Sequence, residues 1–277
     1  MPILHAIILG IVQGLSEFLP ISSSGHLIVV PWLFGWNDFA NSVAAEKAFD
    51  TALHLGTLIA VLFYLRRELQ LYIRDGVVAI FVRSKRESVH GRLAWLFVVS
   101  SLPAAIAGGI GDAWITERLG KPWLIGCSLV IFGVILLWAD RQSGLRDVES
   151  FTVRDAVTIG LAQVLALNPG TSRSGITITA ARRQGFSRDA AARVSFLMGV
   201  PVIAGAVGYK LLKLVSDGMP DGLFVPLVAG IVASGISGWL AMWGMIRLLR
   251  TRSFAPFVVY RVFVGFGILM LVASNLR

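Results

Sequence analysis

The chain has 277 residues, of which 56% are hydrophobic and only 15% are charged. A soluble domain carries roughly 25% charged residues. This composition, with a mean hydropathy of +0.75, therefore excludes a soluble globular enzyme, a disordered chain and a disulfide scaffold. It indicates an integral membrane protein with several spanning helices. The single cysteine, Cys127, excludes a disulfide and a thiolate metal cluster, and the formal net charge of +9 indicates loop asymmetry rather than a nucleic-acid partner.

The first hydrophobic segment, residues 2–30, is broken at residues 19–25 by the sequence LPISSSG. No basic region precedes it, so we expect no cleavable signal. A second segment, residues 152–180, is broken at residues 168–175 by NPGTSRSG. Irregular backbone at membrane depth is tolerated only where protein buries it or where it lines a wet cavity. We therefore predict that both segments form re-entrant helix–loop–helix hairpins.

Six further runs are apolar enough to cross a bilayer as helices of about 20 residues. The apolar residues are continuous rather than alternating, which favours helices over barrel strands. Asp50, His54 and Arg261 are polar exceptions inside these runs, and the sequence leaves their roles open. The runs are residues 48–65, 93–111, 122–139, 194–209, 222–246 and 254–274.

The two broken segments resemble each other at an offset of 150 residues: residues 10–25 read GIVQGLSEFLPISSSG and residues 160–175 read GLAQVLALNPGTSRSG. Chance similarity between two Ser/Gly/Pro breaks is the alternative. Each half then contains a hairpin and three spans, and an odd number of crossings inverts the second half. The predicted fold is all-α, a single membrane domain with six spanning helices and two re-entrant hairpins. These form two inverted-topology repeats, residues 1–145 and 150–277.

The distribution of the basic residues supports this arrangement of spans and hairpins. Of the 25 Lys and Arg residues, 17 fall on one side of the predicted membrane and six on the other. The positive-inside rule makes the richer side cytoplasmic, so the first hairpin enters from outside and the second from the cytoplasm. We interpret residues 66–92, the most basic segment, as a solvated cytoplasmic loop that can touch anionic lipid. The other segments on this side are residues 140–155, 181–193 and 247–252.

Glu17 is the only acidic residue among positions 1–37. A carboxylate in an apolar membrane segment is costly, which makes it a functional candidate. Gln13 lies four residues earlier, on the same helical face. Together they provide oxygen ligands for a hard cation such as Mg²⁺ or Ca²⁺. The alternative is that Glu17 pairs with Arg173 and only joins the two hairpins.

Three serines, a glycine and a histidine follow the first break, at positions 22–26. Ser22 and Ser24 can cap the next helix, whose free N–H groups favour an anion, and Gly25 permits close backbone approach. His26 comes three residues after Ser23, so a hydroxyl and its general base or acid can face one point on a helix. Alternatively, the serines only cap and the histidine satisfies a buried carbonyl.

The second break carries Arg173 within an apolar segment, where it needs an anionic partner. Its planar guanidinium matches phosphate oxygens. The alternative is that Glu17 alone neutralises it. The residues around it form a donor-rich cradle that we predict to bind substrate: Gly170, Thr171, Ser172, Ser174 and Thr177.

These two motifs, QGLSEFLPISSSGH at 13–26 and PGTSRSGIT at 169–177, resemble those of the undecaprenyl-pyrophosphate phosphatase (bacitracin-resistance) family. Length, motif spacing and basic loops extend the resemblance over essentially the whole chain. It implies removal of the terminal phosphate from undecaprenyl pyrophosphate, which yields the carrier lipid reused in peptidoglycan synthesis. It therefore implies roles in cell wall biogenesis, cell shape and resistance to the antibiotic bacitracin. It also implies a bacterial plasma-membrane enzyme that depends on a divalent cation and has an outward-facing active site.

By motif position, the resemblance implies a metal-binding pair at Gln13 and Glu17, a nucleophile at Ser23, an essential histidine at His26 and an essential arginine at Arg173. Ser172 and Thr177 complete the second motif. Two positions depart from the family pattern. The neutral Gln13 is expected to weaken metal binding, and Arg193 stands where an acid is common.

The sequence thus predicts a membrane phosphatase acting on a polyprenyl pyrophosphate whose tail lies between helices or in bilayer lipid. Serine, water and histidine remain open as the nucleophile, and a homodimer remains open as the oligomeric state. The alternative is a polyprenyl-phosphate flippase that uses the same anion site, because transporters are often built from inverted repeats with broken helices. Ser23 and His26 favour the enzyme, since transport requires no nucleophile.

Overall fold

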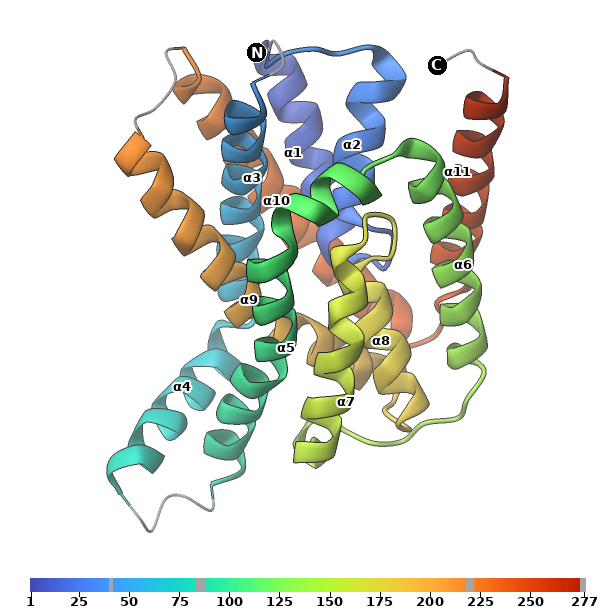
Figure 1. The fold of residues 1–277 in the computed structure, drawn as a ribbon. Helices are drawn as coiled ribbons and strands as arrows, with labels where there is room; N and C mark the ends of the chain where they lie inside the picture. Colours follow the sequence, from blue (N-terminus) through green and yellow to red (C-terminus); the bar gives the residue numbers. More distant parts are fainter. Residues whose placement is uncertain (40–41, 83–87, 218–221, 275–277) are drawn as a thin grey trace.

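The computed structural model describes residues 1–39, 42–82, 88–217 and 222–274 (Figure 1). Its regular structure is helical, apart from one isolated β-bridge between Arg146 and Phe186. Short 3₁₀ turns, Val148–Ser150 and Leu165–Leu167, flank the seventh α-helix. The α-helices are α1 (Ile3–Phe18), α2 (Ser23–Phe34), α3 (Val43–Tyr64), α4 (Arg66–Phe81), α5 (Val89–Leu119), α6 (Pro122–Asp140), α7 (Val153–Val164), α8 (Arg173–Arg183), α9 (Arg188–Asp217), α10 (Phe224–Leu249) and α11 (Ala255–Ala273).

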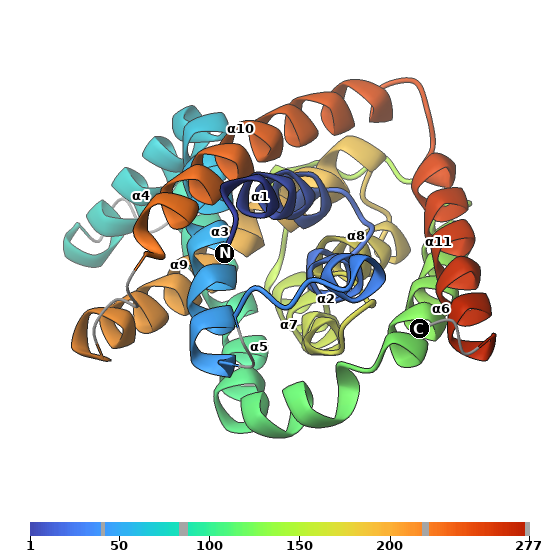
Figure 2. The ribbon, with the colours of Figure 1, turned by 90° about the horizontal axis from the view of Figure 1, so that it is seen from above.

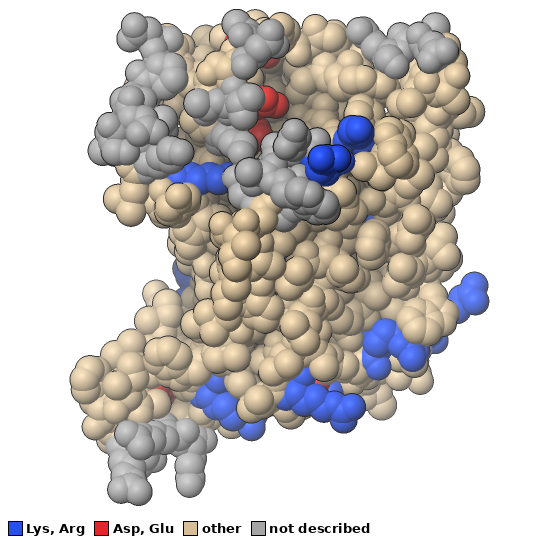
Figure 3. Space-filling model, in the orientation of Figure 1, with Lys and Arg blue, Asp and Glu red and all other residues tan. Residues whose placement is uncertain are grey.

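Within the described residues, five helices are long and apolar enough to cross a membrane: α5, α6, α9, α10 and α11. A sixth span results if α3 and α4, which bend by 84° at their junction, count as one broken crossing. All six predicted runs coincide with helices of the structure. On the face drawn in Figure 3, a broad band with few charged side chains separates charged residues at the two ends of the molecule. The predicted class, an all-α multi-pass membrane protein, is confirmed.

The prediction of a solvated loop at residues 66–92 is wrong for residues 66–81, which form α4, and for residues 89–92, which begin α5. Helix α4 extends away from the bundle beside α5 (Figure 1). It buries Tyr72 and Gly76, and the indole N–H of Trp95 in α5 donates to the Gly76 carbonyl at 3.1 Å. An apolar stripe hidden among charged residues was the signal for this amphipathic helix. Residues 83–87 of the predicted loop lie outside the described residues.

Both helix breaks fall where the Pro/Gly/Ser sequences stand, and they share one local geometry. Ser22 caps α2 and Ser172 caps α8, and their hydroxyls accept hydrogen bonds from the N–H groups of Gly25 and Gly175, at 3.4 and 3.1 Å. Their φ angles are 80° and 75°, and no other non-glycine residue among those described has a positive φ. Such strained backbone typically marks functional sites.

The hairpin helices pack against spans from the other half of the chain: α1 lies against α10, and α7 against α5. Gly10 and Gly160, which correspond at the 150-residue offset, allow these contacts. A Cβ atom on either glycine would lie 2.5 Å from a carbonyl oxygen, that of Gly230 for Gly10 and that of Ser100 for Gly160. The helices α1, α2, α7 and α8 consequently lie in the middle of the bundle, surrounded by the longer helices (Figure 2).

Candidate active site

The two breaks bring Glu17, at the end of α1, against Arg173, at the start of α8. The Nη2 and Nε atoms of Arg173 lie 3.2 and 3.4 Å from Oε1 of Glu17. Only 5% of the carboxylate side chain and 13% of the arginine side chain is exposed. Burying two charges is expensive unless they are paired and hydrogen-bonded, so each side chain requires the other. The structure thus joins the two intramembrane charges that the sequence singled out.

The second carboxylate oxygen of Glu17 receives neutral donors. Its Oε2 atom accepts hydrogen bonds from the Ser23 hydroxyl at 2.7 Å and from the Gln13 amide at 3.1 Å. His54 of α3 holds its Nε2 atom 3.7 Å from the same oxygen. The Ser23 hydroxyl therefore points at a carboxylate that can accept its proton, and His54 lies beside the site.

His26 faces a different partner from the one that its spacing predicted. Its Nδ1 atom lies 2.7 Å from the Ser22 carbonyl oxygen, and its Nε2 atom lies 2.9 Å from the Tyr260 hydroxyl of α11. Because a carbonyl only accepts, Nδ1 carries the proton and Nε2 accepts from Tyr260. The expected hydrogen bond between Ser23 and His26 is therefore absent. Ser23 is the first residue of α2, and its side chain points back toward α1.

Helix α9 supports the guanidinium of Arg173 from a third side. The Nη1 atom of Arg173 donates to the Ser195 carbonyl at 3.0 Å. The hydroxyl of Thr177 lies 2.8 Å from both the Arg173 carbonyl and the Ser195 hydroxyl. Gly199 lies directly against the guanidinium, and a Cβ atom there would be 2.8 Å from Cζ of Arg173. Sequence reasoning missed Ser195 and Gly199, because nothing distinguishes them within an apolar span.

Arg261 of α11 holds the two breaks together. Its guanidinium is fully buried and donates to the carbonyl oxygens of Pro20, Gly170 and Thr171, at 3.0, 2.9 and 3.0 Å. A further bond of 3.0 Å reaches the Leu129 carbonyl in α6. The carbonyls of Pro20, Gly170 and Thr171 lie in the unwound breaks and have no partner within a helix, so the arginine satisfies their hydrogen-bonding capacity. The structure thus gives Arg261 a role in joining the breaks, which the sequence left open.

Most of the predicted substrate-binding residues already have protein partners. The Ser22 hydroxyl accepts from the Gly170 N–H at 3.0 Å, and the Ser174 hydroxyl donates to the Leu19 carbonyl at 3.0 Å. Ser172 bonds Ser174, and Thr171 bonds Asn168, at 3.1 Å each. Ser24 is exposed, whereas Gly25 and the substrate-binding residues predicted in the second motif are buried: Gly170, Thr171, Ser172, Ser174 and Thr177. In this arrangement the hydroxyls shape the breaks, and their contact with substrate stays a prediction.

The residues predicted to hold the cation present one oxygen without a hydrogen-bond partner. Oε1 of Gln13 is buried without a hydrogen-bond partner, whereas the Nε2 atom of the same amide donates to Glu17, whose two oxygens both accept hydrogen bonds. No group of three or more His, Cys, Asp or Glu residues in the described ranges could hold a metal. Mg²⁺ commonly uses one or two protein oxygens and completes its shell with substrate phosphates and water. The pair fits a cation of this kind, which would bind together with the substrate.

The fold and the site define a class: a helical membrane protein with a carboxylate, an arginine and a hydroxyl buried where two broken helix pairs meet. The chain belongs to the bacitracin resistance protein BacA family, whose family model matches residues 6–267. The resemblance that the motifs indicated is thereby confirmed.

Three relatives illustrate this membership, and each is named undecaprenyl-diphosphatase. The chain is 44% identical over 281 residues to that of Pelobacter propionicus, with 100% of this chain and 99% of the relative covered. It is 45% identical over 271 residues to that of Geobacter sulfurreducens, with 97% and 98% covered. It is 40% identical over 278 residues to that of Trichlorobacter lovleyi, with 100% and 99% covered.

Proposed function

We propose that this protein is an undecaprenyl-diphosphatase, which hydrolyses undecaprenyl pyrophosphate to undecaprenyl phosphate and inorganic phosphate. Full-length relatives at 40–45% identity bear this name. The observation that carries the proposal is the Ser23 hydroxyl, held 2.7 Å from the Glu17 carboxylate that also binds Arg173. A flippase for the same lipid is not favoured, since transport does not require a hydroxyl placed on a proton acceptor.

Each residue of the site has a separate role in the proposed reaction. Arg173 binds the phosphate oxygens and stabilises the charge that develops on them. The Ser23 oxygen bonds to the terminal phosphorus as its proton passes to Glu17. The bond from phosphorus to the bridging oxygen breaks, and undecaprenyl phosphate leaves. Water then cleaves the phosphoserine and releases inorganic phosphate, with His26 as the second proton-handling group.

A divalent cation, Mg²⁺ or Ca²⁺, held by Gln13 and Glu17, would neutralise part of the pyrophosphate charge. The unpartnered amide oxygen of Gln13 supports this assignment. Because Gln13 is neutral, the substrate oxygens must supply more of the binding free energy than they would with a second carboxylate.

We also propose the finer topology: six spans and two re-entrant hairpins in two inverted repeats, residues 1–145 and 150–277. The matching caps at Ser22 and Ser172 and the reciprocal packing of α1 on α10 and α7 on α5 support it. The 17-to-6 bias of basic residues supports a bacterial plasma-membrane protein whose active site faces outward. There it would recycle the carrier lipid for peptidoglycan synthesis.

Phosphate release tests the proposed function. We expect the purified protein in detergent micelles to release one phosphate from each polyprenyl pyrophosphate. Chelator should abolish the release, and added Mg²⁺ or Ca²⁺ should restore it. Binding of the lipid without phosphate release would contradict the phosphatase, and full activity in chelator would contradict the cation.

Gly199→Ala tests whether α9 positions Arg173. The new methyl group would collide with the guanidinium tip rather than with backbone, so Arg173 must move away from Glu17. We expect turnover to fall at least about tenfold, the scale of one charge-assisted hydrogen bond, because the displaced guanidinium loses its bond to Glu17. Gly205→Ala is the matched control on the same helix, since a Cβ atom there meets nothing within 4 Å. Equal activities of the two variants would rule out this positioning role.

Tyr260→Phe removes the donor to His26 but keeps the ring, whose centroid lies 5.7 Å from that of the imidazole. One neutral hydrogen bond contributes about 0.5–1.5 kcal/mol, so we expect turnover to fall by about 2- to 10-fold. Tyr209→Phe, at a tyrosine that is 71% exposed, should leave turnover unchanged. Steady-state kinetics measure the turnover of both variants. Lower turnover in Tyr209→Phe but not in Tyr260→Phe would contradict the assignment.

A further inference from the structure

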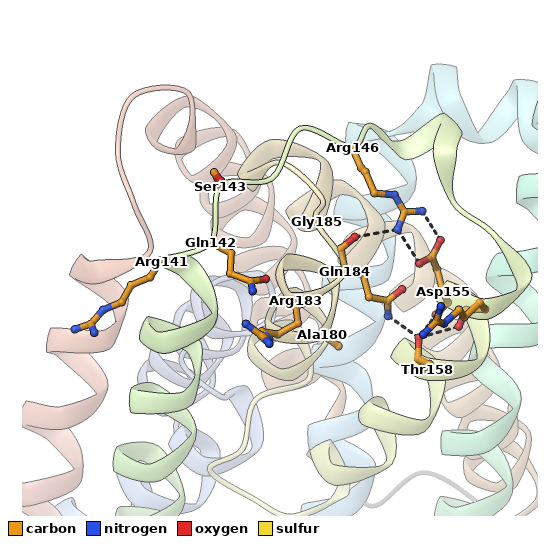
Figure 4. Close-up of a pocket in the computed structure, with 11 residues that line it drawn as sticks. Arg141, Gln142, Ser143, Arg146, Asp155, Thr158, Ala180, Arg183, Gln184 and Gly185 are labelled. Carbon is orange, nitrogen blue, oxygen red and sulfur yellow. Dashed lines mark hydrogen bonds and ion pairs between the residues drawn. The ribbon is translucent and has the colours of Figure 1, made fainter.

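A polar cavity lies at the opposite end of α8 from the active site. Its volume is about 860 Å³, and the start of α7, the end of α8 and the loop after α6 form its walls (Figure 4). Helix α8 has 11 residues from Arg173 to Arg183. At 1.5 Å per residue its two ends are about 15 Å apart. The cavity is therefore separate from the site that holds Glu17 and Arg173.

Arginine dominates the charge of this cavity. Arg141, Arg146, Arg154 and Arg183 line it together with a single acid, Asp155. The carboxylate of Asp155 is already occupied: it accepts two bonds from Arg146, at 2.6 and 3.0 Å, and it also accepts from the Thr152 hydroxyl and N–H. Among the described residues, the remaining three arginines have no acidic partner. The cavity thus carries a net positive charge.

The arginines differ in how they face the cavity. In Figure 4, Arg183 lies between Gln142 and Gln184, whereas Arg141 points away from the other side chains. The guanidinium of Arg183 lies 4.1 Å from the ring centre of Trp138, at the end of α6. Stacking on the indole fixes its orientation and leaves its N–H edge free for a ligand. Arg183 is therefore oriented to bind an anion, and Arg154 lines the same cavity without an acidic partner among the described residues.

An apolar stripe lies on α7 next to Arg154 and Thr158, which line the cavity. Val153, Val157 and Leu161 follow one another at four-residue spacing on α7 and are 64, 45 and 57% exposed. Trp138 is 53% exposed, as expected for a tryptophan at the level of lipid headgroups. The cavity lies on the side that the charge bias predicts to be cytoplasmic, where the leaflet is anionic. A phosphate in the cavity and acyl chains along α7 would satisfy both surfaces.

We propose that this cavity binds the phosphate group of an anionic membrane lipid such as phosphatidylglycerol. Arg154 and Arg183 bind the phosphate oxygens, and the acyl chains cover the stripe of Val153, Val157 and Leu161. A zwitterionic lipid binds more weakly, because its own cation enters a basic cavity. Inorganic phosphate shares the headgroup chemistry but has no chain to cover α7. The lipid would join α6, α7 and α8 and stabilise the second hairpin.

Thermal unfolding of the full-length protein in detergent micelles tests this site. We expect phosphatidylglycerol to raise the melting temperature by several degrees in a saturable manner, and phosphatidylcholine or sodium phosphate to have little effect. The double variant Arg154→Gln/Arg183→Gln should need at least tenfold more phosphatidylglycerol for half of the effect. Arg247→Gln is the matched control, because its guanidinium also stacks on a tryptophan, Trp243, but outside the cavity. It should keep the wild-type midpoint.

Three results would overturn the proposal: a wild-type midpoint in the double variant, an equal effect of phosphatidylcholine, or protection by sodium phosphate alone to which the lipid adds nothing. The last would make the free anion the ligand. Phosphate release in detergent without added lipid should be unchanged in the double variant. This unchanged activity would show that the variant is correctly folded. If it does not fold, Arg154→Lys/Arg183→Lys keeps the charge without the planar fork and should show an intermediate midpoint.

Discussion

Glu17→Gln should lower phosphate release by about 10²–10⁴-fold. Loss of the group that accepts the nucleophile's proton lowers the rate by about 10²–10⁴-fold, and breaking the buried ion pair also lowers the stability of the fold by about 3–5 kcal/mol. The variant leaves Arg173 buried without its counter-charge and deprives Ser23 of the carboxylate that its hydroxyl contacts at 2.7 Å. It also removes the anionic cation ligand, so added Mg²⁺ or Ca²⁺ should no longer stimulate turnover. Initial rates at several cation concentrations measure both effects.

A second comparison separates catalysis from structural pairing. Glu68→Gln removes a more exposed acid, paired with Arg193 at 3.1 Å, and should change turnover by less than about twofold because exposed ion pairs contribute little. The double variant Glu17→Gln/Arg173→Gln should regain the melting temperature lost by Glu17→Gln, since no buried charge remains unpaired. It should stay inactive. Wild-type turnover in Glu17→Gln would show that the acid only joins the hairpins.

The Ser23→Ala variant tests which atom attacks phosphorus. We expect its turnover to be at least about 10³-fold lower than that of the wild type. A serine nucleophile carries the covalent route, so its removal eliminates the phosphoenzyme. If water attacks instead, the variant loses a single hydrogen bond, and turnover falls roughly tenfold at most. The contact with Glu17 favours the serine, because it provides the proton acceptor that a hydroxyl nucleophile needs.

The intermediate can be trapped directly. Substrate labelled in its terminal phosphate is turned over briefly and quenched in acid, and the labelled peptide is then located. Phosphate on Ser23 would support the assignment, and phosphate on His26 would overturn it. Ser24→Ala provides the comparison, because this neighbouring serine is exposed, and it should lose at most tenfold. A Ser23→Ala variant that retains a tenth or more of the activity and forms no phosphoenzyme would identify water as the nucleophile.

The sequence alone determined the class, the six apolar runs and the two breaks. Apolar length and the conformational limits of Pro, Gly and Ser are local properties, and the bilayer leaves few alternatives for such segments. It also identified Glu17 and Arg173, because an isolated charge in an apolar segment needs a partner. The family motifs then indicated the activity that the full-length relatives support. Among the described helices, α4 was missed, since its apolar stripe is interrupted by charged residues.

The tertiary structure decided which side chains meet. Ser23 bonds Glu17 across the first break, whereas His26 turns to Tyr260, 234 residues away along the chain. Arg261 joins the breaks through carbonyl oxygens, and Gly199 makes room for Arg173. Residue spacing fixes neighbours on one helix, but contacts between helices depend on how the whole bundle packs. The partners of the two hairpins therefore became visible only once the surrounding helices were in place.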